Sequence, residues 1–307
     1  MAAAAAGQSY PARPVHLIAP TPPGSTPDIV ARTLAAKLQG AFGQPVIVEN
    51  RAGAGGNIAA EAVAKAAADG YTLFVGINGP VATNKHLYKS LPYDPEKDFA
   101  PISLLASAPQ MLVVVPELQV DTFKAFIDYA RANPGRISYG SVGSGSASHL
   151  TMELLKNEAE IHVVHVPYRG FPPAVTDMLT GNIQAMFAII PGVLPHVKAG
   201  KMKALAVTAL KRSELVPDVP SVQEIGYPQL ESLAWIGLLA PASTPSEVLA
   251  RLGTETVRGM TAPDVRDLLG KQGFDVVASS PAEFKRWAAA ESQKWARVIK
   301  ASGATAD

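Results

Sequence analysis

Two junctions far apart in this chain each join a strand to a helix through a loop of small residues. The apolar run Val15–Ala19 leads into residues 20–25, and a helix is expected from Thr26. Tyr139 leads into residues 141–148, which are rich in serine and glycine, before a helical pattern. A helix N-terminus carries unpaired amides and the positive end of the helix dipole, which favour anions. Together the two junctions predict an anion held from two sides.

The composition excludes several classes of protein. Of 307 residues, 48% are hydrophobic and 17% charged, which indicates a folded chain with a sizeable core. The 27 basic and 26 acidic residues nearly balance and form no like-charge run, so we expect no nucleic-acid partner. No apolar run approaches the roughly 20 residues that cross a bilayer, so we expect no direct membrane insertion. The chain has no cysteine, which excludes disulfides and thiolate chemistry.

Strands and helices alternate along most of the chain, which predicts an α/β fold with parallel strands. The expected strands are 15–19, 46–48 and 71–75, then 111–115, 137–139, 163–166, 183–187 and 204–207. The expected helices are one capped by Thr26, then 58–68, 122–132, 148–157, 173–180 and 193–199. After residues 235–240 the pattern becomes helical, over 245–260, 263–272 and 281–301.

This order predicts two domains. We expect residues 11–105 and 235–307 to form a discontinuous first domain and residues 106–234 a second one. The crossovers would lie near 103–110 and 232–239, and a ligand would sit between the domains at the carboxyl ends of the strands. Residues 1–10 have small residues but no basic or long apolar segment. We interpret them as a flexible tail or signal-peptide remnant of an exported protein; the alternative is a cytosolic protein with an Ala-rich tail.

Signatures of enzymes and metal sites are absent from the sequence. Residues 53–58 carry two glycines of a dinucleotide fingerprint, but Ile58 stands where the third belongs. No Walker A loop and no Gly-x-Ser-x-Gly elbow occur. His162 and His165 are three apart in an expected strand, so they face opposite sides and cannot chelate together. We expect neither a cofactor nor a metal.

Several polar residues at the strand ends have two interpretations each. His149 either donates a hydrogen bond to the ligand or orders the Ser/Gly loop, by which we mean residues 141–148. Asp28 either lies in the site or holds loop amides and complements the helix dipole. Asn78 and Tyr168 follow other strands and form either the wall of a cleft or ordinary turns and packing. Arg169 we expect to be a solvated rim charge, because the helix N-termini already supply directional donors.

The motifs resemble, in order and spacing, the solute receptors of tripartite tricarboxylate transporters, also called Bug receptors. They are Pro22-Pro23-Gly24-(x3)-Asp28, residues 48–56 (Val-Glu-Asn-Arg-Ala-Gly-Ala-Gly-Gly), Asp69-Gly70-Tyr71-Thr72-Leu73, Val166-Pro167-Tyr168-Arg169-Gly170, and residues 195–208. The resemblance implies a periplasmic-binding-protein-like fold of type II, with two mixed or parallel sheets, flanking helices and a hinge of two crossover segments. It also implies a monomeric periplasmic receptor that closes on a small organic carboxylate and delivers it to the membrane permease subunits.

The resemblance also implies which residues contact the ligand. The first loop, by which we mean residues 20–25, and the Ser/Gly loop would hold one carboxylate through main-chain amides, hydroxyls and water. The candidate ligand-binding residues are Pro23, Gly24, Ser25, Thr26, Asp28, Asn78, Ser141, Gly143, Ser144, Gly145, Ser146, Ser148, His149, Tyr168 and Ala188.

The chain departs from the family pattern at two of these positions. Ser25 replaces a common glycine, and Ala188 stands where many members carry an aspartate facing the cleft. Losing that acceptor disfavours ligands with an ammonium group, so a dicarboxylate or aromatic acid is expected rather than an amino acid. The alternatives are an α/β enzyme acting on a carboxylate in the same cleft, and a sensor that signals to a partner protein.

Overall fold

The computed structural model describes residues 10–306 and confirms the α/β class. In the first unit, three parallel strands lie in the order β2–β1–β3, which are Val46–Asn50, Val15–Ala19 and Thr72–Ile77. Helices α1 (Thr26–Phe42) and α2 (Asn57–Ala64) connect them, because parallel neighbours need a crossover. Strand β1 is buried on both faces: Leu17 packs in the cluster that holds α1, and Ile18 in the cluster that holds α2.

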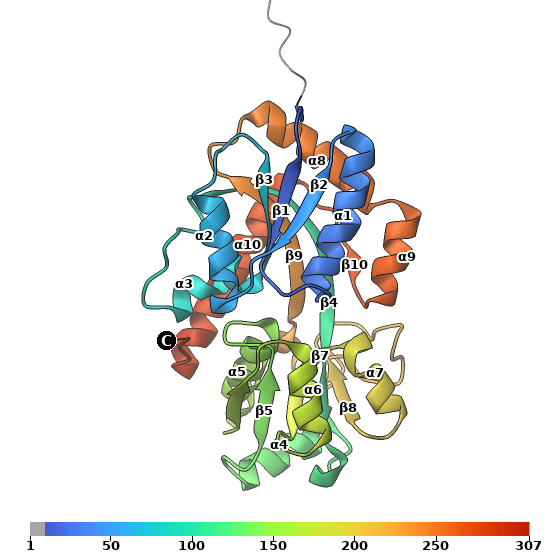
Figure 1. The fold of residues 1–307 in the computed structure, drawn as a ribbon. Coiled ribbons are helices and arrows are strands. Elements are labelled where there is room, and N and C mark those ends of the chain that lie inside the picture. Colours follow the sequence, from blue (N-terminus) through green and yellow to red (C-terminus); the bar gives the residue numbers. More distant parts are fainter. Residues whose placement is uncertain (1–9, 307) are drawn as a thin grey trace, which may run out of the picture.

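Two long antiparallel strands, β4 (Phe99–Val114) and β9 (Leu233–Pro241), join the units (Figure 1). Strand β9 lies between β3 and β4. Over residues 110–114, β4 leaves β9 and pairs with strands of the second unit. The strands of the described region are therefore connected into a single curled sheet.

In this region the sequence-based strand boundary was wrong, because the strand expected from residue 111 begins at Phe99. Residues 103–110, expected as a crossover before a strand at 111, belong to β4 itself. Pro101 and Pro109 interrupt the strand pattern in the sequence, and the β4–β9 register shifts beside Pro101 and again between Leu104 and Ala106. Irregular pairing of this kind tolerates the proline at residue 101, whereas Pro109 lies in a regular stretch opposite Leu233.

The second unit has the expected alternation, with element ends shifted by a few residues. Strand β5 (Ser138–Ser141) lies between β6 (Val164–Pro167) and β7 (Ala185–Ile189) and is parallel to both. Strand β8 (Lys203–Val207) pairs antiparallel with β4. The flanking helices are α4 (Phe123–Ala132), α5 (Ala147–Ala159), α6 (Phe171–Leu179) and α7 (Ile190–Lys198).

The C-terminal helices return to the first unit, but the last one contacts both units. Helices α8 (Ser246–Met260) and α9 (Pro263–Lys271) contribute to the same buried cluster as β1 and α1. Strand β10 (Asp275–Val276), which we did not expect, pairs with β4. Helix α10 (Pro281–Ser302) begins at a capping box of Ser280 and Glu283. Its Phe284 packs in a first-unit cluster, whereas Trp295 and Ile299 pack in the second-unit core.

Short helical turns complete the fold. They are η1 (Ala54–Gly56), η2 (Gly79–Thr83), α3 (Asn84–Leu87), η3 (Pro116–Leu118) and η4 (Pro228–Leu230). In Figure 1 the C-terminal end of α10 lies near α3, and Leu87 of α3 packs in the same second-unit cluster as Trp295. The unit boundary is therefore bridged by α3 and α10 as well as by β4 and β9.

The domain division at residues 105 and 235 stays a prediction, because α10 packs on both sides of it. Tyr10, expected in the tail, is anchored: its hydroxyl donates to the Gly70 carbonyl at 2.6 Å, and its ring packs edge-on against Phe42 and Tyr71. Residues 1–9, the rest of the expected tail, lie outside the described residues.

Candidate ligand-binding site

The parallel strands of both units end where the units meet. Strand β1 ends in the first loop, residues 20–25, and β5 ends in the Ser/Gly loop. In Figure 1 the start of α1 lies at the lower end of the first unit, directly above the upper ends of α5 and α6. The two helix N-termini singled out in the sequence therefore lie on opposite sides of one region.

A glycine turn lies between the two loops and contacts both. A Cβ atom on Gly56 would lie 3.1 Å from Pro20 Cβ, and one on Gly55 would lie 3.7 Å from the Ser144 carbonyl oxygen. Both glycines have positive φ, 93° and 62°, a conformation that glycine adopts without strain. This turn, which lies in the 48–56 motif of the family resemblance, thus spaces the two loops.

The first loop is held by its own hydrogen bonds. Helix α1 has Ser25 rather than the predicted Thr26 at its N-cap position, with Pro27 in the first turn. The Ser25 hydroxyl bonds back into the loop, to Thr21 Oγ1 at 2.6 Å and the Pro22 carbonyl at 2.7 Å, and does not cap the helix. Pro23 and Gly24 are exposed at the tip.

Asp28 supports this loop from below. Its carboxylate is 2% exposed and accepts hydrogen bonds from the Gly24 amide (2.8 Å), Asn50 Nδ2 (2.8 Å) and Arg32 Nε (3.0 Å). Burial alone would raise the pKa of Asp28, but these hydrogen bonds and the Arg32 charge hold it below its usual value. All the recorded bonds of this carboxylate are internal, so the structure supports the loop-ordering interpretation of its side chain.

The Ser/Gly loop is a compact hydrogen-bonded turn. Ser146 is the N-cap of α5: its hydroxyl accepts from the His149 amide at 3.3 Å and donates to the Gly143 carbonyl at 2.6 Å. Ser148 Oγ accepts from the Val142 amide at 3.1 Å, and Ser141 Oγ from the Gly143 amide at 3.2 Å. The serines therefore fix the backbone of the loop.

Four amides at the two helix starts make no hydrogen bond to any of the described residues. They belong to Thr26 and Asp28 in α1, and to Ala147 and Ser148 in α5. Unpaired first-turn amides at the positive ends of two helix dipoles are suited to carboxylate oxygens.

Two histidines lie beneath the Ser/Gly loop. His149 Nδ1 accepts from the Gly145 amide at 3.1 Å, and His165 Nε2 lies 2.7 Å from Ser141 Oγ. Burial lowers the pKa of His149 to about 4; burial and the neighbouring His149 lower that of His165 to about 3. The bond of His149 to the Gly145 amide favours the loop-ordering interpretation of its side chain. His165 was considered only as a metal ligand in the sequence, and no sequence periodicity links it to His149.

A hydrogen bond from the first unit reaches the Ser/Gly loop. Thr83, which is fully buried, donates from Oγ1 to the Gly145 carbonyl at 3.2 Å. A Cβ on Gly145 would lie 2.7 Å from Asn84 Oδ1, so only glycine fits at this contact. Thr83 and Asn84 were not singled out in the sequence, because neither lies in a recognisable motif.

Two other candidate side chains are engaged within the protein. The Asn78 amide donates to the Leu233 carbonyl and accepts from the Trp235 amide, each at 3.1 Å, so it ties β3 to β9. The Tyr168 hydroxyl donates to Asp177 Oδ2 at 2.6 Å. Burial, and after it this hydrogen bond, raises the pKa of Tyr168 to about 12.

The remaining candidates differ in exposure. Ala188 is 3% exposed and lies in β7, opposite Met111 of β4, within the second-unit core. Ser144 is half-buried, and Arg169 is exposed, as expected for a rim charge.

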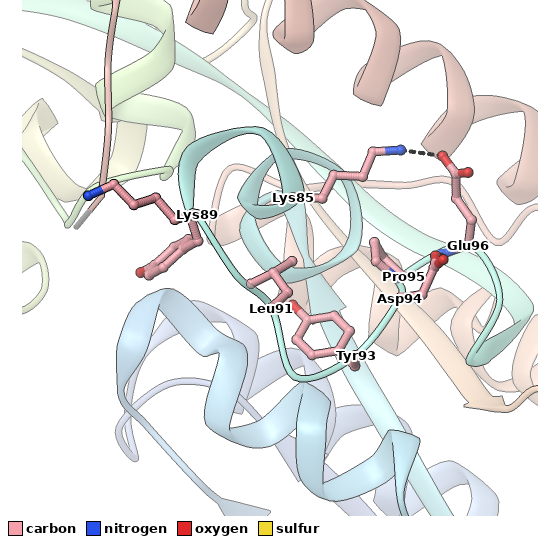
Figure 2. A pocket seen from close by; sticks show the side chains of 8 residues that line it. Lys85, Lys89, Leu91, Tyr93, Asp94, Pro95 and Glu96 are labelled. Atoms are coloured by element: carbon pink, nitrogen blue, oxygen red, sulfur yellow. Dashed lines mark hydrogen bonds and ion pairs between the residues drawn. The ribbon is translucent and has the colours of Figure 1, made fainter.

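The described region has two surface cavities, and no candidate residue lines either of them. The first, about 290 Å³, is lined by Lys85, Tyr88, Lys89, Leu91, Tyr93, Asp94, Pro95 and Glu96, with an ion pair between Lys85 and Glu96 (Figure 2). The second, about 340 Å³, is lined by Leu104, Val277, Ala278, Ser279, Glu283 and Trp287. Within residues 10–306, no cluster of histidine and acidic side chains is arranged to hold a metal ion. None of the described helices has the length and apolar character of a membrane span.

Comparison with known proteins identifies the family. A family model described as "Tripartite tricarboxylate transporter family receptor" matches residues 30–304. The chain belongs to this family. Protein BugT of Bordetella pertussis is 37% identical to it over 305 residues, which cover 99% of this chain and 94% of BugT.

Solved receptor structures match the fold closely. Rpa4515 of R. palustris, solved with adipate, has 35% identity and a TM-score of 0.88, covering 96% of this chain and 98% of that one. MatC from Rhodopseudomonas palustris, solved with bound malate, has 33% identity and a TM-score of 0.85, covering 94% of this chain and all of that one. These matches confirm the resemblance and the two-domain type II fold. Members of the family are solute-binding receptors, so this chain is a transport receptor and not an enzyme.

Proposed function

We propose that this receptor binds a small organic carboxylate between the first loop and the Ser/Gly loop and delivers it to the permease subunits of a tripartite tricarboxylate transporter. Receptors of this family are periplasmic, and we propose that compartment for this chain. The observation that carries the proposal is the set of unpaired amides at the starts of α1 and α5.

The proposed contacts are mostly main-chain amides. Thr26, Asp28, Ala147 and Ser148 offer their unpaired amide groups as donors to carboxylate oxygens. The side chains of Asp28, Asn78, His149 and Tyr168 are already bonded within the protein. We propose that these four hold the shape of the site, while Pro23, Gly24, Ser25, Gly143, Ser144, Gly145 and Ser146 form its walls.

The ligand class follows from charge and polarity. The two solved receptor structures named above hold dicarboxylates, adipate in one and malate in the other. In this chain Ala188 at the end of β7 offers no carboxylate to an ammonium group. We therefore propose a dicarboxylate or an aromatic acid as the ligand, in preference to an amino acid.

We propose that binding is coupled to closure about residues 107–110 of β4 and residues 232–239 around β9. These two strands carry the chain between the units, and a few residues at element ends absorb most hinge rotations. The domains would be residues 11–105 with 235–307, and residues 106–234, with α10 following the movement of both.

A thermal-shift screen tests the proposed ligand class. Ligand that binds only the folded state stabilises it by RT ln(1 + [L]/Kd), about 2.7 kcal/mol at a hundredfold excess over Kd. For a chain of this size that is a rise of about 4 °C in Tm. The panel comprises malate, adipate, aromatic acids, amino acids, sugars and divalent cations.

We expect shifts with dicarboxylates or aromatic acids only. Shifts confined to sugars, cations or amino acids would contradict the proposal. Small-angle scattering with the best acid then tests closure, which predicts a smaller radius of gyration than in the ligand-free protein.

A further inference from the structure

The rings of His149 and His165 form a stacked pair directly under the Ser/Gly loop. Their centroids are 4.1 Å apart and their planes differ by 16°. The Tyr139 ring continues the stack, 4.9 Å from His165 with an interplanar angle of 23°. The three rings come from different elements, α5, β6 and β5, so the stack joins the helix to the sheet below the loop.

Each histidine is bonded to a different part of the loop. His149 Nδ1 accepts from the Gly145 amide, which requires a neutral ring with its proton on Nε2. His165 Nε2 meets the Ser141 hydroxyl, and that hydroxyl accepts from the Gly143 amide. The stacked pair therefore spans the loop from its first residue to the glycine before the N-cap of α5.

The far side of the stack is closed by buried polar groups. The Tyr139 hydroxyl donates to Glu153 Oε1 at 2.6 Å, and Lys156 Nζ donates to both oxygens of Glu153, at 2.7 and 2.9 Å. Tyr139 and Glu153 are almost fully buried. Tyr139, Glu153 and Lys156 are the titratable groups recorded around the two imidazoles, and their mutual bonds leave the histidines to face the loop.

The Gly145 bond matters because of where it lies. Gly145 has φ of 79° and immediately precedes Ser146, the residue from which α5 starts. Its rotation would turn the N-cap and with it the unpaired amides of Ala147 and Ser148. Fixing the Gly145 amide therefore fixes the direction of the two donors proposed for the carboxylate.

We infer that His149 and His165 are the positioning residues of the Ser/Gly loop through their hydrogen bonds to Gly145 and Ser141, and that they set carboxylate affinity through the loop backbone without touching the ligand. This inference rests on the proposed function for its effect on affinity, but the effect on the loop itself does not depend on any ligand.

The variants separate the hydrogen bond from the ring. His149→Phe keeps a stacking ring and removes the acceptor for Gly145. His149→Asn removes the ring but places Oδ1 at the position of Nδ1, so it restores the acceptor. His165→Phe and His165→Gln make the same comparison for the Ser141 bond. His162→Phe is the control, since His162 is exposed and lies in the chain three residues before His165.

The first measurement is hydrogen exchange of the ligand-free protein, read on peptides that cover residues 141–149. We expect exchange about tenfold faster in His149→Phe, near wild-type in His149→Asn and unchanged in the control, since a lost internal hydrogen bond exposes its amide to opening. In wild-type protein, imidazole ¹⁵N shifts must place the His149 proton on Nε2. Unchanged exchange in His149→Phe, or the proton on Nδ1, overturns the inference, and the ¹⁵N result stands even if a variant fails to fold.

The second measurement is calorimetry with malate and adipate. We expect the affinity for the acid to fall about tenfold in His149→Phe and to return most of the way to the wild-type value in His149→Asn. Equal affinity in all variants would overturn the inference while leaving the proposed function intact. If wild-type protein binds neither these acids nor any other in the panel, the proposed function fails, and the exchange data still decide the role of the pair in the loop.

Discussion

Moderate acid should destabilise this protein through His149. The pKa of His149 falls from 6.5 to about 4 on folding, chiefly because the ring is buried. Between these values the unfolded chain binds a proton that the folded chain does not, so stability is full above about pH 6.5 and is lost as the pH falls toward 4. At about pH 5 the loss is about 1.5 pH units times 1.36 kcal/mol, or about 2 kcal/mol. His165, whose pKa is lowered by burial and by His149, acts in the same direction.

Urea unfolding followed by tryptophan fluorescence, at about pH 7, 6 and 5, measures this loss. Wild-type protein should lose at least about 2 kcal/mol over that range. At about pH 7 the free energy of unfolding of His149→Phe should be lower than that of wild-type, because the Gly145 amide loses its acceptor. Between about pH 7 and 5 this variant should then lose about 2 kcal/mol less stability than wild-type does. The exposed control His162→Phe should follow wild-type. A wild-type loss below about 1 kcal/mol, or an equal loss in His149→Phe, would refute the buried neutral state of His149.

Three further changes test the site and its supports by urea unfolding. Gly145→Ala should lower the free energy of unfolding more than Gly181→Ala, because Gly181 has a similar φ (80° against 79°) but open space around it. Gly181→Ala therefore isolates the φ strain, about 1–2 kcal/mol. Equal losses of stability in the two variants would mean that the Asn84 contact is relaxed. Asp28→Ala should cost about 2 kcal/mol or more, since the Gly24 amide and its other buried donors lose their acceptor; wild-type stability would contradict that account. Ser280→Ala should cost about 1 kcal/mol through the lost N-cap of α10, and a negligible change would show that packing alone fixes this helix start.

The junctions between strands and helices could be predicted because their signals are local. The apolar spacing of Val30, Leu34 and Leu38 and the early Pro27 determine α1 whatever it packs against. The cap was misplaced by one residue, because the Ser25 hydroxyl bonds within the loop and not to the helix. Such competition between side-chain bonds depends on the folded loop.

Features that depend on tertiary pairing were beyond the sequence. Strand β4 contains Pro101 and Pro109 and is stabilised by partners distant in the chain, so its first half did not read as a strand. The sequence pattern of α10 predicted an amphipathic helix, but it could not predict that this helix packs against both units. His165 lies beside His149 only because the fold brings these two residues of β6 and α5 together. Ring stacking leaves no periodic pattern in a sequence.

The central claim is that main-chain amides at the two helix starts, and not a charged side chain, bind the carboxylate. Calorimetry on Ala147→Pro and Arg169→Ala, with the acid that gives the largest thermal shift, tests it most directly. Ala147 is the first residue of α5, a position that accepts proline, and Ser146 before it is extended (ψ 159°) as a residue before proline requires. The substitution therefore deletes one unpaired amide while the helix is kept, which far-UV circular dichroism and Tm can verify.

We predict that Ala147→Pro weakens binding at least about tenfold, because a charged acceptor loses one of its hydrogen-bond donors. Arg169→Ala should change affinity only a few-fold, because the charge of Arg169 is solvated. A larger loss in Arg169→Ala than in a folded Ala147→Pro would contradict recognition by the main chain.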